Sequence, residues 1–392
     1  MTLVFTASVI TYLDRVCMSV AGPLMQKDLG LTQIQLGWVF SAFYFAYALF
    51  EVPTAWLGDR WGQRNMMTRI VGCWSLFTIF TGLARSYGSL LAIRFIFGGA
   101  EAGAFPTLSR ALARWFPVQE RSRANGLMWT GARLGGAIAP ALAVTVIAWL
   151  GWRGAFFVFG SVGFLWCIVW WSWYRDHPGI ERPAASEKHS VPWRRLLLNR
   201  NLLLLFFAYF ASGFGFQFFV TWLPTYLMKE HGVSLAKSGY LASLPLAAGA
   251  IGSAIGGVVA DFLSRRFGSI TVGRRAVGVI GFWLGAAGFI GAIYAGSAEA
   301  AVACLVLAAG AHDMVLPVMW ATCTDVGGRF GGTASGFMNL ASSLSGMCAP
   351  MASAWLNEVF GSFYPVFFVA ALVYVLGGLQ WFFIDLRKSA EI

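Results

Sequence analysis

The sequence predicts an all-α integral membrane protein with twelve transmembrane helices in two six-helix halves. Three observations lead to this fold class. First, 58% of the 392 residues are hydrophobic and 11% are charged, whereas a soluble domain carries about 25% charged residues. Second, a membrane-spanning helix needs about 20 apolar residues, so the apolar content is sufficient for roughly ten to twelve spans. Third, a short motif recurs at matching positions of the two halves.

Apolar runs separated by charged or Gly/Pro breaks define the expected spans. The polar stretch 176–200, which contains several prolines and charges, predicts a cytoplasmic linker between an N-terminal half, 1–175, and a C-terminal half, 201–392. This division leaves no room for a separate soluble domain. The expected spans lie near residues 3–25, 33–57, 67–86, 88–112, 123–149 and 153–174, and then near 201–228, 238–262, 275–296, 299–324, 333–357 and 363–385.

The net charge of +11 arises from 28 Lys and Arg against 17 Asp and Glu. These charges lie in loops between apolar runs and not on an amphipathic patch, so we attribute them to membrane topology and expect no nucleic-acid partner. Most of the basic residues fall in alternate loops. The positive-inside rule then places these loops and both termini in the cytoplasm. We expect a multi-pass protein of a bacterial-type inner (plasma) membrane, surrounded by lipid and functional as a monomer.

The residues that would support other classes of function are missing from the sequence. The six cysteines lie inside apolar runs with no C-x-x-C pair, which argues against disulfides and zinc sites. The sequence contains no H-E-x-x-H motif, no phosphate-binding G-x-x-x-x-G-K-[ST] loop and no Ser-His-Asp arrangement. We therefore predict no metal site, no cofactor and no enzymatic activity.

The recurring motif is an acid followed by several cations at the end of a span. It occurs after the second and the eighth expected spans, at the same place in each half. Twelve spans divided six and six, with this element in both halves, resemble the major facilitator superfamily over essentially the whole chain. We expect these charges to hold the cytoplasmic side closed in the outward-facing state, whereas the alternative interpretation is an ordinary solvated loop. The expected gate residues are Asp59, Arg60 and Arg64 in the first half, and Asp261, Arg265 and Arg266 in the second.

Within that superfamily, four stretches together resemble the anion:cation symporter family. They are Tyr12-Leu13-Asp14-Arg15 in the first span, Arg94-Phe95 through Glu101-Ala102-Gly103-Ala104-Phe105-Pro106 in the fourth, Gly151-Trp152-Arg153 before the sixth, and Trp222-Leu223-Pro224-Thr225-Tyr226-Leu227 in the seventh.

Two acids lie deep inside expected spans. At 1.5 Å per residue, Asp14 and Glu101 each lie about 20 Å from the start of antiparallel helices, so they could share the bilayer midplane. Asp14 precedes Arg15 directly, and Arg94 lies two helical turns before Glu101. We therefore expect each acid to be neutralised by the cation on its own span, so that proton binding and anion binding are linked. The alternative is that these residues form structural ion pairs between helices.

The resemblance to the anion:cation symporters adds roles for these residues. In sugar-acid symporters of that family, the acids of the first and fourth spans are proton sites and the first-span arginine engages the substrate. The matching motifs place these roles on Asp14, Glu101 and Arg15, and they make Arg94 a residue that tunes Glu101.

Other polar residues inside spans complete the expected substrate site. Arg133, in the fifth span, is either a second cation for a dianionic substrate or a partner of an acid such as Glu51. In the C-terminal half, hydrogen-bonding and aromatic groups could recognise hydroxyl groups, and the resemblance places Trp320 and Asn339 at polyol-contacting positions. Packing in the core is the alternative for them. The full set of expected substrate contacts is Tyr12, Arg15, Tyr47, Arg133, Gln217, Trp320 and Asn339.

His312 and Asp313 lie in the middle of the tenth span, where this chain departs from the sugar-acid symporters. They could form a second proton relay, a cation site or a buried hydrogen-bonded pair. We favour the buried pair.

These observations together predict a secondary transporter that imports a small organic anion by proton symport and alternating access. A sugar acid such as a hexonate, hexuronate or aldarate meets the predicted chemistry. A proton-coupled antiporter of drugs or cations is one alternative, and Arg15 and Arg133 inside the spans argue against it. A sodium-coupled organic anion or phosphate symporter is the other, and at this point both coupling ions stay open.

Overall fold

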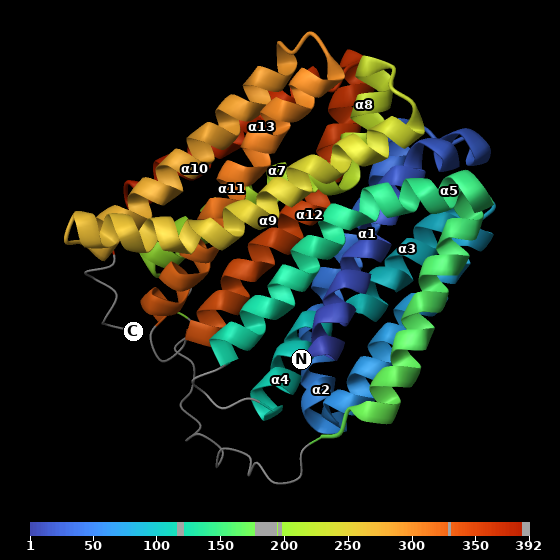
Figure 1. Ribbon diagram of the computed structural model, residues 1–392, viewed down its shortest axis with the longest axis horizontal. Coiled ribbons are helices and arrows are strands. Elements are labelled where there is room, and N and C mark those ends of the chain that lie inside the picture. The colour runs from blue at the N-terminus through green and yellow to red at the C-terminus, as the bar shows by residue number, and fades with distance from the viewer. Residues whose placement is uncertain (116–120, 177–193, 195–197, 328–330, 386–392) are drawn as a thin grey trace. The chain divides into compact units, whose positions relative to one another are not determined.

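The computed structural model describes residues 1–115, 121–176, 194, 198–327 and 331–385, except for the side chains at 52, 55, 56, 58–60, 113, 114, 121–123, 125, 126, 324 and 331–333. Within these ranges every regular element is helical (Figure 1), which confirms the predicted all-α class. Nine of the described helices are long and apolar enough to cross a membrane. The chain divides into two compact units, one of Met1–His189 with Ser234–Ser243, the other of Ser190–Val233 with Leu244–Ile392.

The first unit is built from α1 (Thr2–Leu29), α2 (Gln33–Leu83), α3 (Tyr87–Glu101), α4 (Ala104–Trp115) and α5 (Arg121–Trp173), coloured blue to green in Figure 1. Two of these helices are longer than one span and reverse direction at a glycine. Gly62 in α2 has φ 78° and Gly151 in α5 has φ 69°. Residues other than glycine rarely adopt this left-handed backbone conformation. Each of the two glycines therefore interrupts its helix and separates it into two legs.

The second unit contains α7 (Arg200–Thr221), α8 (Leu223–His231), α10 (Ile270–Ile293), α11 (Ala298–Gly327), α12 (Gly331–Phe360) and α13 (Tyr364–Trp381), and also most of α9 (Leu235–Arg266). With α2 and α5 each counted as two legs, and with α3/α4 and α7/α8 as broken spans, the helix order fits the predicted six plus six. The linker predicted at 176–200 lies mostly outside the described residues.

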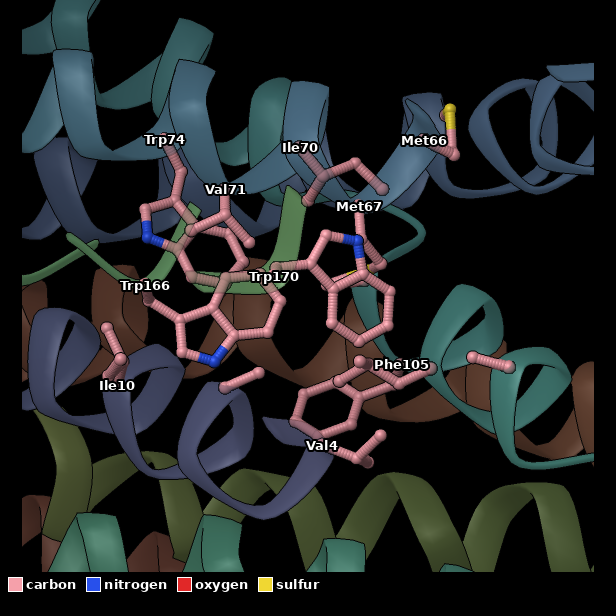
Figure 2. Packing of buried hydrophobic residues seen from close by; sticks show 14 of the residues in the cluster. Val4, Ile10, Met66, Met67, Ile70, Val71, Trp74, Phe105, Trp166 and Trp170 are labelled. Carbon is pink, nitrogen blue, oxygen red and sulfur yellow. The ribbon is translucent and has the colours of Figure 1, made fainter. Parts of the chain in front are cut away.

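Two stacked tryptophans of α5 form the centre of the core in the first unit. Figure 2 shows Trp166 and Trp170 between α1 and the second leg of α2. Their buried indole N–H groups find backbone partners: Trp166 donates to the carbonyl oxygen of Leu3 at 3.1 Å, and Trp170 donates to that of Arg64 at 3.1 Å. Large aromatic area and a satisfied N–H group together fix the two neighbouring helices against α5.

The reversal at Gly62 is held by a side chain from the end of α5. The carboxylate of Asp176 accepts a hydrogen bond from the backbone N–H of Gln63 at 3.0 Å. This N–H belongs to the first turn of a helical leg, where backbone donors have no partner within the helix. Asp176 therefore acts as an N-cap from a distant part of the chain.

The fourth span is broken within its Glu-Ala-Gly-Ala-Phe-Pro sequence, between α3 and α4. Pro106 has no N–H to donate to the carbonyl of Ala102, and its ring disfavours a continuous helix there. Gly103 takes up the break with φ 80°. As a result Glu101 is the last residue of α3 and lies at the interruption. Interrupted helices in transporters commonly carry ion and substrate sites.

Candidate functional site

Among the described residues of the first unit, three charged side chains are buried and a fourth, that of Arg15, is largely buried; two belong to α1 and two to α3. Asp14 is 1% exposed and Arg94 is 3% exposed, while the side chains of Glu101 and Arg15 are 0% and 12% exposed. Charged groups at membrane depth are costly unless they are paired or solvated. Their formal charges sum to zero when all four are ionised.

The hydrogen-bonded pair joins the two helices. Nε of Arg15 donates to Oε1 of Glu101 at 2.6 Å, and Nη2 of Arg15 lies 2.5 Å from the same oxygen. The expectation that Arg15 neutralises its neighbour Asp14 is therefore wrong. Successive residues of a helix project about 100° apart, so Asp14 and Arg15 point in different directions, and Arg15 reaches α3 instead.

Aromatic rings surround both guanidinium groups. The Arg15 guanidinium carbon lies 5.0 Å from the ring centres of Phe43 and Tyr47 and 5.4 Å from that of Tyr12. The Arg94 guanidinium lies 4.3 Å from the ring centre of Phe97 and 5.3 Å from that of Phe43. Cation–π contacts at these distances stabilise a charge that has lost its water. The structure therefore brings the predicted residues Tyr12, Arg15 and Tyr47 together.

Asp14 lies on another side of the same charge cluster. It interacts electrostatically with Glu101 and with Arg94, and the indole of Trp74 lies beside its carboxylate. Through these charges Asp14 is coupled to the Arg15–Glu101 pair without touching it. A change of charge at either acid alters the electrostatic energy of the other.

Three of the four side chains retain unused hydrogen-bonding capacity. Among the described residues, no hydrogen-bond partner is found for either oxygen of Asp14, for Oε2 of Glu101 or for Nε of Arg94. Buried polar atoms in folded proteins are nearly always satisfied. The cluster can therefore accept protons at its carboxylates and offer donors to an anion. The described residues contain no group of three His, Cys, Asp or Glu side chains placed to hold a metal ion.

Close packing between α2 and α3 sets the geometry of this cluster. A Cβ atom at Gly98 would overlap the backbone carbonyl oxygen of Phe43, so only glycine allows the two helices to approach so closely. This contact lies one turn from both Arg94 and Glu101. It fixes α3 against the helix that supplies Phe43 and Tyr47.

The residues predicted in the C-terminal half lie in the second unit. Trp320 donates its indole N–H to the hydroxyl of Tyr209 at 3.2 Å, with the two rings nearly perpendicular. Gln217 is 3% exposed on α7, and its Oε1 has no hydrogen-bond partner among the described residues. Asn339 is partly exposed on α12. The structure thus places a donor, a hydroxyl and an amide inside this unit.

Comparisons with known proteins identify the family of the chain. The sequence profile described as Major Facilitator Superfamily matches residues 4–272. The chain belongs to this superfamily. A crystal structure of a bacterial homologue of the human lysosomal transporter Spinster, in an inward-facing and occupied conformation, superposes with a TM-score of 0.85 over 99% of this chain and 96% of that chain, at 20% sequence identity. It confirms the fold.

Curated relatives narrow the class of this superfamily member. The probable sulfoacetate transporter SauU of Cupriavidus necator is 35% identical over 96% of this chain and 91% of its own length. A D-galactonate transporter of Escherichia coli is 29% identical over 97% and 94%, and a hexuronate transporter of Bacillus subtilis is 30% identical over 96% and 91%. The chain is therefore a multi-pass membrane transporter of organic anions and not an enzyme, and its resemblance to the anion:cation symporters is confirmed.

The predicted gate residues of the first unit and those of the second unit have different environments. The side chains of Asp59 and Arg60 lie outside the described residues. Arg64 packs on α5 of its own unit: its guanidinium lies 4.0 Å from a ring centre of Trp171 and donates to the Trp171 carbonyl oxygen at 2.6 Å. The corresponding residues of the second unit, Asp261, Arg265 and Arg266, are exposed at the end of α9.

Sequence reasoning missed two aromatic residues of the site, Phe43 and Trp74. Phe43 lies one helical turn before Tyr47, so the i, i+4 spacing could have found it. Trp74 approaches Asp14 from the second leg of α2, and no local pattern indicates that contact. Arg133 is partly exposed on α5.

Proposed function

We propose that this transporter imports a small organic anion together with protons by alternating access. Asp14 and Glu101 are the proton sites, Arg15 binds the anion, and Arg94 tunes the charge of both acids. The observation that carries the proposal is the Arg15–Glu101 ion pair in the interior of the first unit, in which Oε2 of Glu101 makes no hydrogen bond to a described residue.

Protonation of Glu101 is the step that links the two ions. An ionised Glu101 competes with a substrate for Arg15, because a guanidinium group binds a substrate carboxylate through the same parallel N–H groups. A proton on Glu101 removes the negative charge and frees Arg15 for a bidentate contact. The charge of Asp14 then influences how readily Glu101 binds a proton, because it acts on Glu101 and Arg94 through the low-dielectric interior.

The energetics favour accumulation of the anion inside the cell. One proton crossing a potential of about 100 mV contributes about 2.3 kcal/mol, and one pH unit contributes about 1.4 kcal/mol. A monoanion carried with two protons therefore moves one net positive charge inward. Both termini and the linker are proposed to be cytoplasmic, with the acid and arginine motifs after the second and eighth spans as the gate.

The substrate is proposed to be a sugar acid or a similarly small organic acid. The relatives named above transport sulfoacetate, D-galactonate or hexuronates by name, and all of these carry an acidic group that a guanidinium can bind. Tyr12, Tyr47 and Arg133 are the further contacts proposed in the first unit. Gln217, Trp320 and Asn339 are those proposed in the second, where they would recognise hydroxyl groups.

Uptake into proteoliposomes tests this proposal. Labelled D-galactonate, D-glucarate, D-glucuronate and sulfoacetate are offered under an inward proton gradient, an inward sodium gradient or neither. We expect one acid to accumulate under the proton gradient, and Asp14→Asn to retain exchange of that acid without accumulating it. Accumulation under the sodium gradient alone would mean that sodium, and not the proton, is the coupling ion. Release of organic cations from loaded vesicles, with no acid accumulated, would favour an antiporter instead.

A further inference from the structure

A second buried titratable cluster lies in the second unit, around His312 on α11. His312 is 1% exposed and Asp313 is 2% exposed. Nε2 of His312 lies 2.6 Å from the hydroxyl oxygen of Ser212 on α7. Nδ1 of His312 lies 3.1 Å from Oδ1 of Asp313, without the alignment of a hydrogen bond.

This cluster joins the same two spans of its half as the Arg15–Glu101 pair does in the other half. Arg15 and Glu101 connect the first span to the fourth. Ser212 and His312 connect α7 to α11, which are the seventh and tenth spans. Because the two halves of the chain are related as repeats, a polar link between equivalent helices occurs in each.

We propose that His312, Asp313 and Ser212 form a second proton-binding site, in the C-terminal half of this transporter. The site takes one proton at a time and holds it at the imidazole. Its link to transport rests on the proton symport proposed above, whereas its capacity to bind a proton does not.

The geometry provides partners for both protonation states of the imidazole. In the neutral state the carboxylate of Asp313 favours the tautomer with its proton on Nδ1, and Nε2 accepts a hydrogen bond from the Ser212 hydroxyl. A proton from water then adds to Nε2, the hydroxyl rotates to accept from the new N–H, and its own proton can turn to a carbonyl in the preceding helical turn, as helical serines do. The His312–Asp313 pair passes from a net charge of −1 to zero. No backbone movement is needed.

The surroundings favour the neutral pair over the negative one. The imidazole lies between the rings of Tyr374 on α13 and Phe216 on α7, with ring centres 5.5 Å and 6.3 Å away. Aromatic faces stabilise a cationic imidazolium, and a positive charge on His312 offsets part of the cost of burying the negative charge of Asp313. On the α9 side, a Cβ atom at Gly249 would overlap Oδ2 of Asp313, so glycine there leaves room for the carboxylate.

The titratable groups that face His312 are Asp313 on its own helix and Tyr374 on α13, while α7 and α9 contribute the uncharged residues Ser212, Phe216 and Gly249. The other helices packed against α11 are α10 and α12. Their charged residues lie near helix ends: Arg274 and Arg275 in the first turns of α10, and Glu358 in the last turn of α12.

Nitrogen NMR on the full-length protein tests proton binding without any substrate. The chain has 4 histidines, so labelling with nitrogen-15 histidine gives few signals, and His312→Gln identifies the one that belongs to His312. We expect this signal to change from imidazolium to imidazole within the pH range in which the protein stays folded, and we expect Asp313→Asn to weaken proton binding at least about tenfold. A His312 signal that keeps one protonation state over the whole range in the wild type would overturn the proposal.

A second measurement tests the link to transport. The ratio of protons to anion is obtained from the reversal potential in proteoliposomes, with D-galactonate as the first probe and the other three acids after it. We expect His312→Gln to lower the ratio by one proton. The matched control is His231→Gln, because His231 Nε2 also contacts a hydroxyl, that of Tyr226 at 2.9 Å, and this variant should keep the wild-type ratio.

The possible outcomes remain distinguishable. If His312 titrates but His312→Gln keeps the wild-type ratio of protons to anion, the cluster binds a proton that does not move with the anion, and the proposed link to transport fails. If none of the four acids is transported by the wild type, the proton symport proposed above fails, and the NMR titration still decides whether the site binds a proton.

Discussion

Glu101→Gln separates anion binding from proton coupling. The substitution keeps the shape of the side chain and an acceptor oxygen for Arg15, but it removes the negative charge permanently. In the wild type, Nε of Arg15 donates to Oε1 of Glu101 at 2.6 Å, with Glu101 fully buried and Arg15 12% exposed. In the variant this contact becomes a hydrogen bond to a neutral amide, and the buried cluster of four residues carries a net charge of +1.

The change in affinity follows from the strength of the competing contact. Hydrogen bonds in which a donor or an acceptor is ionised are roughly twice as strong as neutral ones, and the amide removes the charge of the acceptor while Arg15 stays charged. An anion that displaces the amide from Arg15 is therefore expected to save about 1 kcal/mol, which corresponds to roughly fivefold tighter binding at neutral pH. Since the amide cannot exchange a proton, concentrative uptake should be lost while exchange of internal for external anion persists.

Calorimetric binding and uptake into proteoliposomes measure the two effects on one preparation, using whichever of the four acids the wild type transports. Asp28→Asn is the matched control, because Asp28 forms a pair with Arg153 at 2.6 Å in the same unit but is 49% exposed. Exposed pairs contribute little, so this variant should bind and accumulate the anion like the wild type. Wild-type accumulation by Glu101→Gln would refute the coupling role, and loss of anion binding by a folded variant would refute the competition for Arg15.

Three further predictions concern packing and helix termini in the first unit. Asp176→Ala removes the cap on the backbone N–H of Gln63 and should destabilise the protein by about 1 kcal/mol, which a lower midpoint of thermal unfolding would reveal. Gly98→Ala forces a methyl group into the carbonyl of Phe43; we expect a loss of about 1–3 kcal/mol and reduced uptake, and unchanged uptake would contradict the role of this contact. Trp170→Ala empties the buried centre of the core and should cost about 3–5 kcal/mol, measured as a fall in the fraction of monodisperse protein after heating.

The class of the protein and the chemistry of its site follow from the sequence, because both depend on which residues occur inside apolar runs. A continuous apolar segment of about 20 residues is typical of a membrane span, and a helix satisfies all of the backbone hydrogen bonds of such a segment within the segment itself. Charged residues in such a segment are costly and are therefore candidates for function. Asp14, Arg15, Arg94 and Glu101 could therefore be recognised as functional candidates before any contact was known.

The pairing of those charges was decided by the tertiary structure. Because Arg15 follows Asp14 directly, the sequence predicted that the two would pair. Neighbouring residues on a helix point in different directions, however, and the approach of α1 to α3 brings Arg15 to Glu101. The same holds for Trp74 beside Asp14 and for Ser212 against His312, contacts between residues 60 and 100 positions apart. Helix packing sets such contacts through small residues and side-chain shape over many turns. The sequence determines these packing interactions, but the resulting contacts between helices cannot be read from local sequence patterns.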